Sequence, residues 1–269
     1  MAAARTPPRM LEVVRAETIG HHLRRVVFSG PQLVGLPRRP GAHIKLFFPR
    51  PHQTRPVLPE LGPHGPIWPP ADVRPIVRTY TLRDYDPARN ELAVEFVLHA
   101  HGGPASRWAA DARPGDALGL AGPGGPDPMV PPSAFYGFVG DLSALPAIHA
   151  VLEGLPSDAR GHVLCEVPDA ADIRELRRPV GVEVQWFVRA PQRPSPLPEA
   201  ATRLPWNTPG TYAFLAGEHG AVVAIRDHLR ARYGFDRRTM YATPYWKAAE
   251  DEETYHEERH RVMDELQET

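Results

Sequence analysis

Two histidines four residues apart, with a glutamate directly after the first, form the stretch HEERH from His256 to His260. On a helix this spacing puts both imidazoles on one face, as in zinc proteases. The surrounding residues 250–269 contain 2 basic and 9 acidic residues, a net charge of −7, and only nine residues follow His260 to supply a third ligand. We therefore interpret this stretch as a solvated acidic helix and expect no metal site.

The tetrapeptide RTYT, Arg78 to Thr81, carries a second set of reactive groups. On a strand, Arg78 and Tyr80 point to one side and Thr81 to the other. The guanidinium suits a pyrophosphate, the aromatic ring suits an isoalloxazine, and the hydroxyl suits a flavin nitrogen or carbonyl. An ordinary arginine on a surface strand is the alternative interpretation of so short a motif.

The segment HAHGGPASRWA, His99 to Ala109, follows a predicted strand. Its glycines end the strand, and a helix is predicted to begin at Ala105 or Ser106, where backbone amides could hold phosphate oxygens. His99 and His101 could also be a metal pair, but the sequence offers no third ligand. The segment therefore favours a phosphate-binding turn.

Short alternating segments dominate the first half of the chain and predict an antiparallel barrel or sandwich. They are residues 22–28, 44–48, 74–85 and 91–98. Residues 49–75 are rich in proline and are predicted to form a long loop. AGPGGPDP, residues 121–128, is predicted to be a linker.

The pattern changes after this linker, because apolar strands now alternate with amphipathic helices. The predicted strands are 135–141, 162–167, 182–188 and 211–218, with helices after the first and the last. This order is typical of an open parallel α/β sheet that binds its ligand at the carboxyl ends of the strands. We predict a β-barrel domain over residues 1–126 and a nucleotide-binding α/β domain over residues 127–269. This is the layout of flavin reductases, so the barrel is the expected place for a flavin.

Composition excludes several classes of protein. The net charge of −1 is too small for general nucleic-acid binding, and no apolar run approaches the ~18 residues of a membrane span. Cys165 is the single cysteine, which favours a reducing cytoplasm. Charge is uneven, however: residues 1–83 hold 13 basic against 4 acidic residues, a net +9 that could meet an anionic partner.

Several motifs in one order resemble the siderophore-interacting protein family, FAD-dependent ferric siderophore reductases of the ferredoxin reductase superfamily. The resemblance runs from about Leu11 to Glu258 and includes RTYTLRDYD, FVLHAHGGPASRWA, GDLSALPAIHAVLE, LAGEHGAVVAIRDHLR and YWK. It implies that FAD contacts Arg78, Thr79, Tyr80, Thr81, His99, Gly103, Pro104, Ala105, Ser106 and Trp246. It also implies that NADPH or NADH reduces the flavin at a site formed by Asp141, Ser143, Ala144, Ala216, Gly217 and Glu218.

Two segments depart from the family pattern. The family usually has GDETALPA where this chain has GDLSALPA, so Leu142 replaces a glutamate and Ser143 a threonine. Pro244 stands before YW, where a glycine is common. These departures leave the nucleotide donor and the local backbone open.

The resemblance assigns Lys247, together with Lys45, to the ferric siderophore, because many ferric siderophores are anions. These are the only two lysines of the chain. The implied activity passes electrons from NAD(P)H through FAD to the ferric siderophore and releases iron(II) in the cytoplasm. The alternatives are a ferric-chelate binding protein without turnover and a flavoprotein that takes its electrons from ferredoxin.

Overall fold

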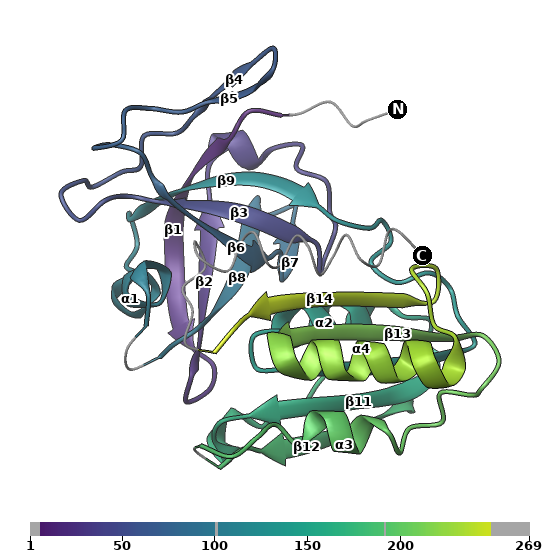
Figure 1. Ribbon diagram of the computed structural model, residues 1–269. Coiled ribbons are helices and arrows are strands. Elements are labelled where there is room, and N and C mark those ends of the chain that lie inside the picture. The colour runs from purple at the N-terminus through teal and green to yellow at the C-terminus, as the bar shows by residue number, and fades with distance from the viewer. Residues whose placement is uncertain (1–5, 100–101, 191, 249–269) are drawn as a thin grey trace. The chain divides into compact units, whose positions relative to one another are not determined.

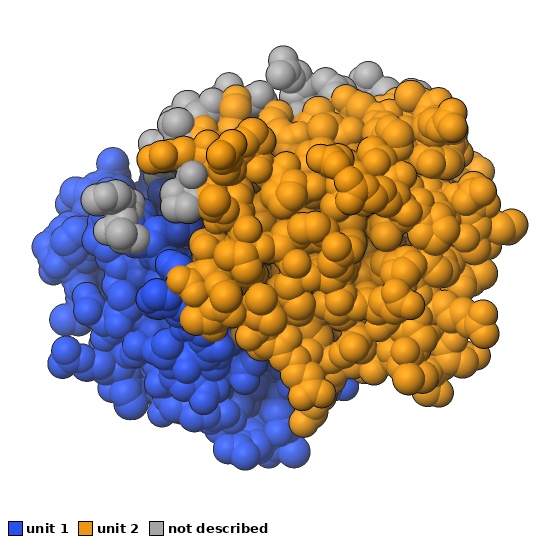
Figure 2. Space-filling view, turned by 90° about the horizontal axis from the view of Figure 1, so that it is seen from below, with its two compact units in different colours: residues 1–127 blue, residues 128–269 orange. Residues whose placement is uncertain are grey.

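The computed structural model describes residues 6–99, 102–190 and 192–248. The chain divides into two compact units, residues 1–127 and residues 128–269, which Figure 2 shows in different colours. Each unit has its own sheet and is described by itself below.

The first unit is built on a seven-stranded sheet in which every neighbouring pair is antiparallel (Figure 1). The strands, in spatial order, are β6 (Ile76–Thr81), β3 (His43–Phe48), β9 (Ala117–Gly124), β1 (Arg9–Thr18), β2 (Leu23–Ser29), β8 (Glu91–Val97) and β7 (Asp84–Asp86). Apolar side chains at every second position of these strands face the core. In β8, for example, the side chains of Leu92, Val94 and Phe96 are fully buried.

Three features of this unit differ from the sequence prediction. β1 was not predicted, although Leu11 and Val13 alternate into the core. The predicted linker over residues 121–128 is wrong in its first half, because β9 continues to Gly124 and pairs there with His43 of β3. The predicted loop over residues 49–75 contains a small hairpin of β4 (Glu60–Gly62) and β5 (Gly65–Ile67).

The second unit holds a five-stranded sheet in which every neighbouring pair is parallel. Its strands, in spatial order, are β12 (Gly181–Val188), β11 (Arg160–Val167), β10 (Phe135–Asp141), β13 (Thr211–Glu218) and β14 (Met240–Trp246). Its helices are α2 (Leu145–Gly154), α3 (Leu197–Ala201) and α4 (His219–Tyr233). Figure 1 shows α3 and α4 on one face of the sheet and α2 on the other.

The order of the strands reverses between β10 and β13. β11 and β12 follow β10 on one side, whereas β13 and β14 lie on its other side. In open α/β sheets this reversal opens a crevice at the carboxyl ends of the two central strands, where ligands bind.

The predicted fold class, an antiparallel β domain followed by an open parallel α/β domain, is confirmed. Helix α4 ends as predicted, because Gly234 adopts the left-handed conformation (φ 72°) that closes it. Within the described ranges, no helix is both long and apolar enough to cross a membrane.

Candidate functional site

The RTYT segment forms the end of β6. In the register of β3 and β6, Tyr80 lies opposite Ile44 and Arg78 lies opposite Leu46. Directly opposite residues share a face of the sheet. Because Ile44 and Leu46 are fully buried in the core, Arg78 and Tyr80 lie on the inner face, and both remain half-buried.

Lys45 and Thr79 lie on the other face of the same two strands. They are directly opposite each other, and the Lys45 ammonium donates a 2.6 Å hydrogen bond to Thr79 Oγ1. Thr81 shares this face and is buried. The predicted flavin residues of β6 therefore lie on both faces of the sheet, and the predicted substrate residue Lys45 of β3 shares the face of Thr79 and Thr81.

The predicted phosphate-binding turn leads into helix α1 (Pro104–Asp111), which begins one or two residues before the predicted start at Ala105 or Ser106. Gly103 is the N-cap, and none of the described side chains caps the helix. A Cβ atom at Gly103 would meet nothing within 4 Å. The Ser106 hydroxyl accepts a 3.1 Å hydrogen bond from the His99 amide, so it stabilises the turn itself.

A cluster of aromatic rings connects β6 with α1. The ring centroid of Tyr80 lies 4.5 Å from that of Phe96, which lies 6.1 Å from the ring centroid of Trp108 in α1. Phe48 contacts all three rings. Arg78 is not part of the cluster but lies on the same face of β6 as Tyr80. The Tyr80 ring, the Arg78 guanidinium and the start of α1 fit the isoalloxazine and the phosphates of FAD.

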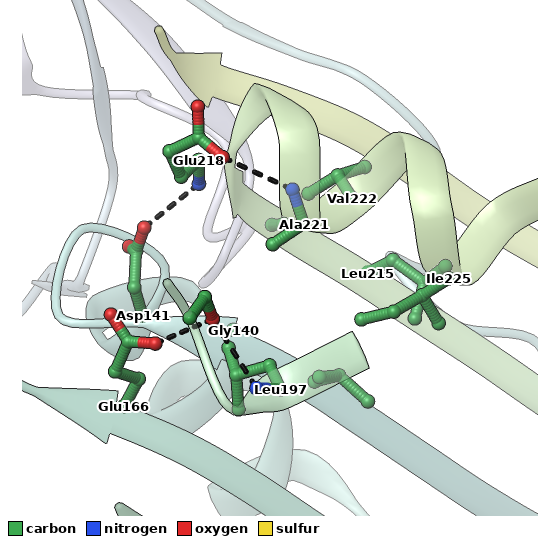
Figure 3. A pocket seen from close by; sticks show the side chains of 12 residues that line it. Gly140, Asp141, Glu166, Leu197, Leu215, Glu218, Ala221, Val222 and Ile225 are labelled. Carbon is green, nitrogen blue, oxygen red and sulfur yellow. Dashed lines mark hydrogen bonds between the residues drawn. The ribbon is translucent and has the colours of Figure 1, made fainter. Parts of the chain in front are cut away.

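The second unit has a hollow at the switch point between β10 and β13 (Figure 3). We call it the strand-end hollow. It is lined by Val139, Gly140, Asp141, Glu166, Ser195, Leu197, Leu215, Ala216, Glu218, Ala221, Val222 and Ile225. Three of the predicted nucleotide residues, Asp141, Ala216 and Glu218, are among them.

Asp141 joins the ends of three strands. One carboxylate oxygen accepts hydrogen bonds from the Ser143 amide (2.8 Å) and the Ser143 hydroxyl (2.6 Å). The other oxygen accepts from the Glu218 amide (2.8 Å) and from the Trp246 indole nitrogen (2.7 Å). Asp141 is buried, so this network fixes the edge of the sheet at which the hollow opens.

Gly217 is required beside this network. Its φ of +130° is rarely adopted by other residues, and a Cβ atom there would lie 2.7 Å from Asp141 Oδ2. Pro244 lies opposite Gly217, immediately before a bulge that places Trp246 opposite Glu218. β14 is an edge strand, where proline is tolerated, so the departure at Pro244 is accommodated by the sheet.

The start of α2 carries the other departure from the family pattern. Leu142 is buried and does not line the hollow. The Ser143 hydroxyl bonds to Asp141, and no side chain caps α2, whose N-cap is the buried Ala144. Glu218 is the N-cap of α4 and accepts a 3.0 Å hydrogen bond from the Ala221 amide.

Sequence reasoning missed Glu166 and Ser195. Glu166 lies near the end of β11, with Oε2 accepting a 2.5 Å hydrogen bond from the Ser195 hydroxyl and Oε1 3.1 Å from Arg189 Nε. Burial raises the pKa of Glu166, and so do the nearby Asp141 and Glu218 carboxylates. A carboxylate at the end of the second strand of a nucleotide-binding fold was a signal that could have identified it.

The described part of the chain contains no group of three or more His, Cys, Asp or Glu side chains that could hold a metal ion. HEERH and His101 lie outside the described residues. Cys165 is buried, and burial raises the pKa of its thiol far above the usual value, so the thiolate is disfavoured.

Lys247 follows directly after β14 and is half-buried. It stands next to Trp246, whose indole is bound to Asp141. The segment that resembles the family's substrate side is therefore held by the same network as the strand-end hollow.

Comparison with known proteins assigns both units to one family. Residues 12–127 match the model of the siderophore-interacting FAD-binding domain, and residues 134–249 match that of the siderophore-interacting protein. The chain is 42% identical to the ferric vibriobactin reductase ViuB of Vibrio cholerae over 97% of both chains. It is 32% identical to the NADPH-dependent ferric-chelate reductase of Escherichia coli, over 89% of this chain and 93% of that one.

The fold agrees with this assignment. The crystal structure of the siderophore-interacting protein SipS from Aeromonas hydrophila matches with a TM-score of 0.86 and 43% identity, covering 96% of this chain and 98% of that one. The chain belongs to the siderophore-interacting protein family.

Proposed function

We propose that this protein is a flavin-dependent reductase that passes electrons from NAD(P)H through FAD to a ferric siderophore. The observation that carries the proposal lies in the first unit, where the aromatic cluster connects Tyr80 with Trp108 of α1 and Arg78 shares the inner face of β6 with Tyr80. The names of relatives that cover nearly the whole chain support the same activity.

FAD, when bound, supplies the conversion of a two-electron hydride into single-electron steps. The chain's own residues bind and orient it. The Arg78 guanidinium pairs with the pyrophosphate, the Tyr80 ring packs on the isoalloxazine, and the amides at the start of α1 hold phosphate oxygens. No side chain has to act as acid or base.

The nicotinamide nucleotide binds at the carboxyl ends of β10 and β13 in the second unit. Asp141 keeps the ends of β10, β13 and β14 in place, so its four hydrogen bonds position the site. Its carboxylate acts through these bonds and needs no contact with the nucleotide.

The ferric siderophore is attracted by positive charge, with Lys247 and Lys45 as the assigned contacts. Hard oxygen ligands hold iron(III) better than iron(II), so reduction releases the metal. We place this release in the cytoplasm, because a chain with the single cysteine Cys165 suits a reducing compartment.

The proposal is tested by purifying the protein, identifying its flavin and adding NADH or NADPH under anaerobic conditions. The yellow flavin absorption is expected to bleach, and ferric siderophore is expected to restore it while a chelator captures iron(II). A yellow protein bleached only by reduced ferredoxin would replace the nucleotide donor with a protein. A colourless protein that binds ferric siderophore would show a binding function without turnover.

A further inference from the structure

Glu166, at the end of β11, occupies the position at which dinucleotide-binding folds distinguish NAD from NADP. β11 is the second strand of the sheet in chain order, and Glu166 is its penultimate residue. In dinucleotide-binding folds, an acidic residue following the second strand binds the ribose 2′-hydroxyl of NAD, whereas an arginine nearby accommodates the 2′-phosphate of NADP. In this protein both types are present, as Glu166 and Arg189, and the two side chains form an ion pair.

The Glu166 carboxylate is held in one orientation. Ser195 holds one oxygen and Arg189 the other, as described above, and the Ser195 oxygen itself accepts a 3.2 Å hydrogen bond from the Leu197 amide. The Glu166 side chain is 7% exposed and that of Arg189 is 33% exposed. Glu166 is thus the buried member of the pair, and its charge compensates that of Arg189.

The charge around this carboxylate is unfavourable for a second anion. Asp141 and Glu218 line the same hollow (Figure 3). Burial raises the pKa of Glu166, and these two carboxylates raise it further. A 2′-phosphate, with nearly two negative charges, would have to enter beside these groups. A ribose hydroxyl would instead donate a hydrogen bond to the carboxylate, which has further lone pairs to accept it.

We propose that Glu166, held in place by Ser195 and Arg189, selects NADH over NADPH as the electron donor. This inference rests on the proposed function, because it assumes that a nicotinamide nucleotide binds in the second unit. The Escherichia coli relative carries NADPH in its name. At 32% identity the two chains would then differ in their donor.

The test compares NADH and NADPH, through kcat/KM for anaerobic flavin reduction and through calorimetric binding of NAD⁺ and NADP⁺. The parent protein is expected to favour the non-phosphorylated nucleotide by about tenfold or more, since a hydrogen bond to a charged group is at stake. Glu166→Gln keeps the side-chain shape and leaves Arg189 uncompensated, so it is expected to shift the ratio toward NADPH by about tenfold. Adding Arg189→Ala to this variant should remove the gain in NADPH use.

Glu183→Gln is the matched control, because it removes one carboxylate charge from the neighbouring strand at a side chain that is 80% exposed. It should leave the nucleotide ratio at the parent value. Equal binding of both nucleotides by the parent, or an unchanged ratio in Glu166→Gln, would overturn the inference and leave the proposed function standing. If calorimetry detected binding of neither nucleotide, the donor assigned under the proposed function would fall together with the inference.

Discussion

Asp141→Asn tests whether one carboxylate holds the functional edge of the second unit. The asparagine amide is expected to place its NH₂ group toward Ser143, because the Ser143 hydroxyl can rotate to accept a hydrogen bond. The Ser143 backbone amide then loses its acceptor, which costs about 1 kcal/mol at a half-buried position. The bonds from the Glu218 amide and the Trp246 indole remain but lose their charged acceptor, at about 1 kcal/mol each.

The expected loss is therefore about 3 kcal/mol in the free energy of unfolding, measured on the full chain by urea denaturation with circular dichroism. Trp246→Phe, which removes one of the four bonds, should cost about 1.5 kcal/mol. Asp158→Asn is the matched control, because Asp158 is exposed in the turn before β11. If Asp141→Asn were within about 0.5 kcal/mol of the parent, like a surface substitution, the network would not stabilise the unit.

Three further predictions concern cofactor, substrate and backbone. Arg78→Ala should lose much of its flavin on gel filtration, since a charged hydrogen bond is worth about 1.5–3 kcal/mol, whereas the exposed control Arg89→Ala should stay fully yellow. Lys247→Glu should slow reduction of an anionic ferric siderophore, most at low salt, with unchanged flavin content; equal rates for anionic and neutral chelates in mutant and parent would refute the role. Gly217→Ala should lower the unfolding free energy by at least about 1 kcal/mol, because of its positive φ and the nearby Asp141 oxygen; a stable variant would contradict this.

Much of the fold could be predicted from the spacing of apolar residues along the sequence. The strands β2, β3 and β8 and the alternation of strands and helices after residue 135 were predicted, because each buries a regular apolar face. β9 was not predicted. Its last residues, Ala121 to Gly124, were assigned to a linker because they are mostly glycine and proline, but tertiary pairing with β3 overrides their weak strand propensity. A local pattern cannot report such pairing.

The site was predictable only in part, for a similar reason. Arg78 and Tyr80 could be placed on one face from the strand period alone, and the register with β3 agrees. The bonds that Asp141 accepts from Glu218 and Trp246 could not be foreseen, because these residues lie 77 and 105 residues away in the sequence. Glu166 was overlooked because its partner Ser195 lies in an irregular, proline-rich stretch with no periodic signal.

The central claim is that electrons pass from a nicotinamide nucleotide through a bound flavin to ferric siderophore. The most direct measurement reduces the protein anaerobically with nucleotide, removes the excess, adds ferric siderophore and counts the iron(II) captured per flavin reoxidised. A hydride carries two electrons, so about two iron(II) per flavin are expected. A flavin that stays reduced in the presence of ferric siderophore, or is reoxidised without forming iron(II), would contradict the claim.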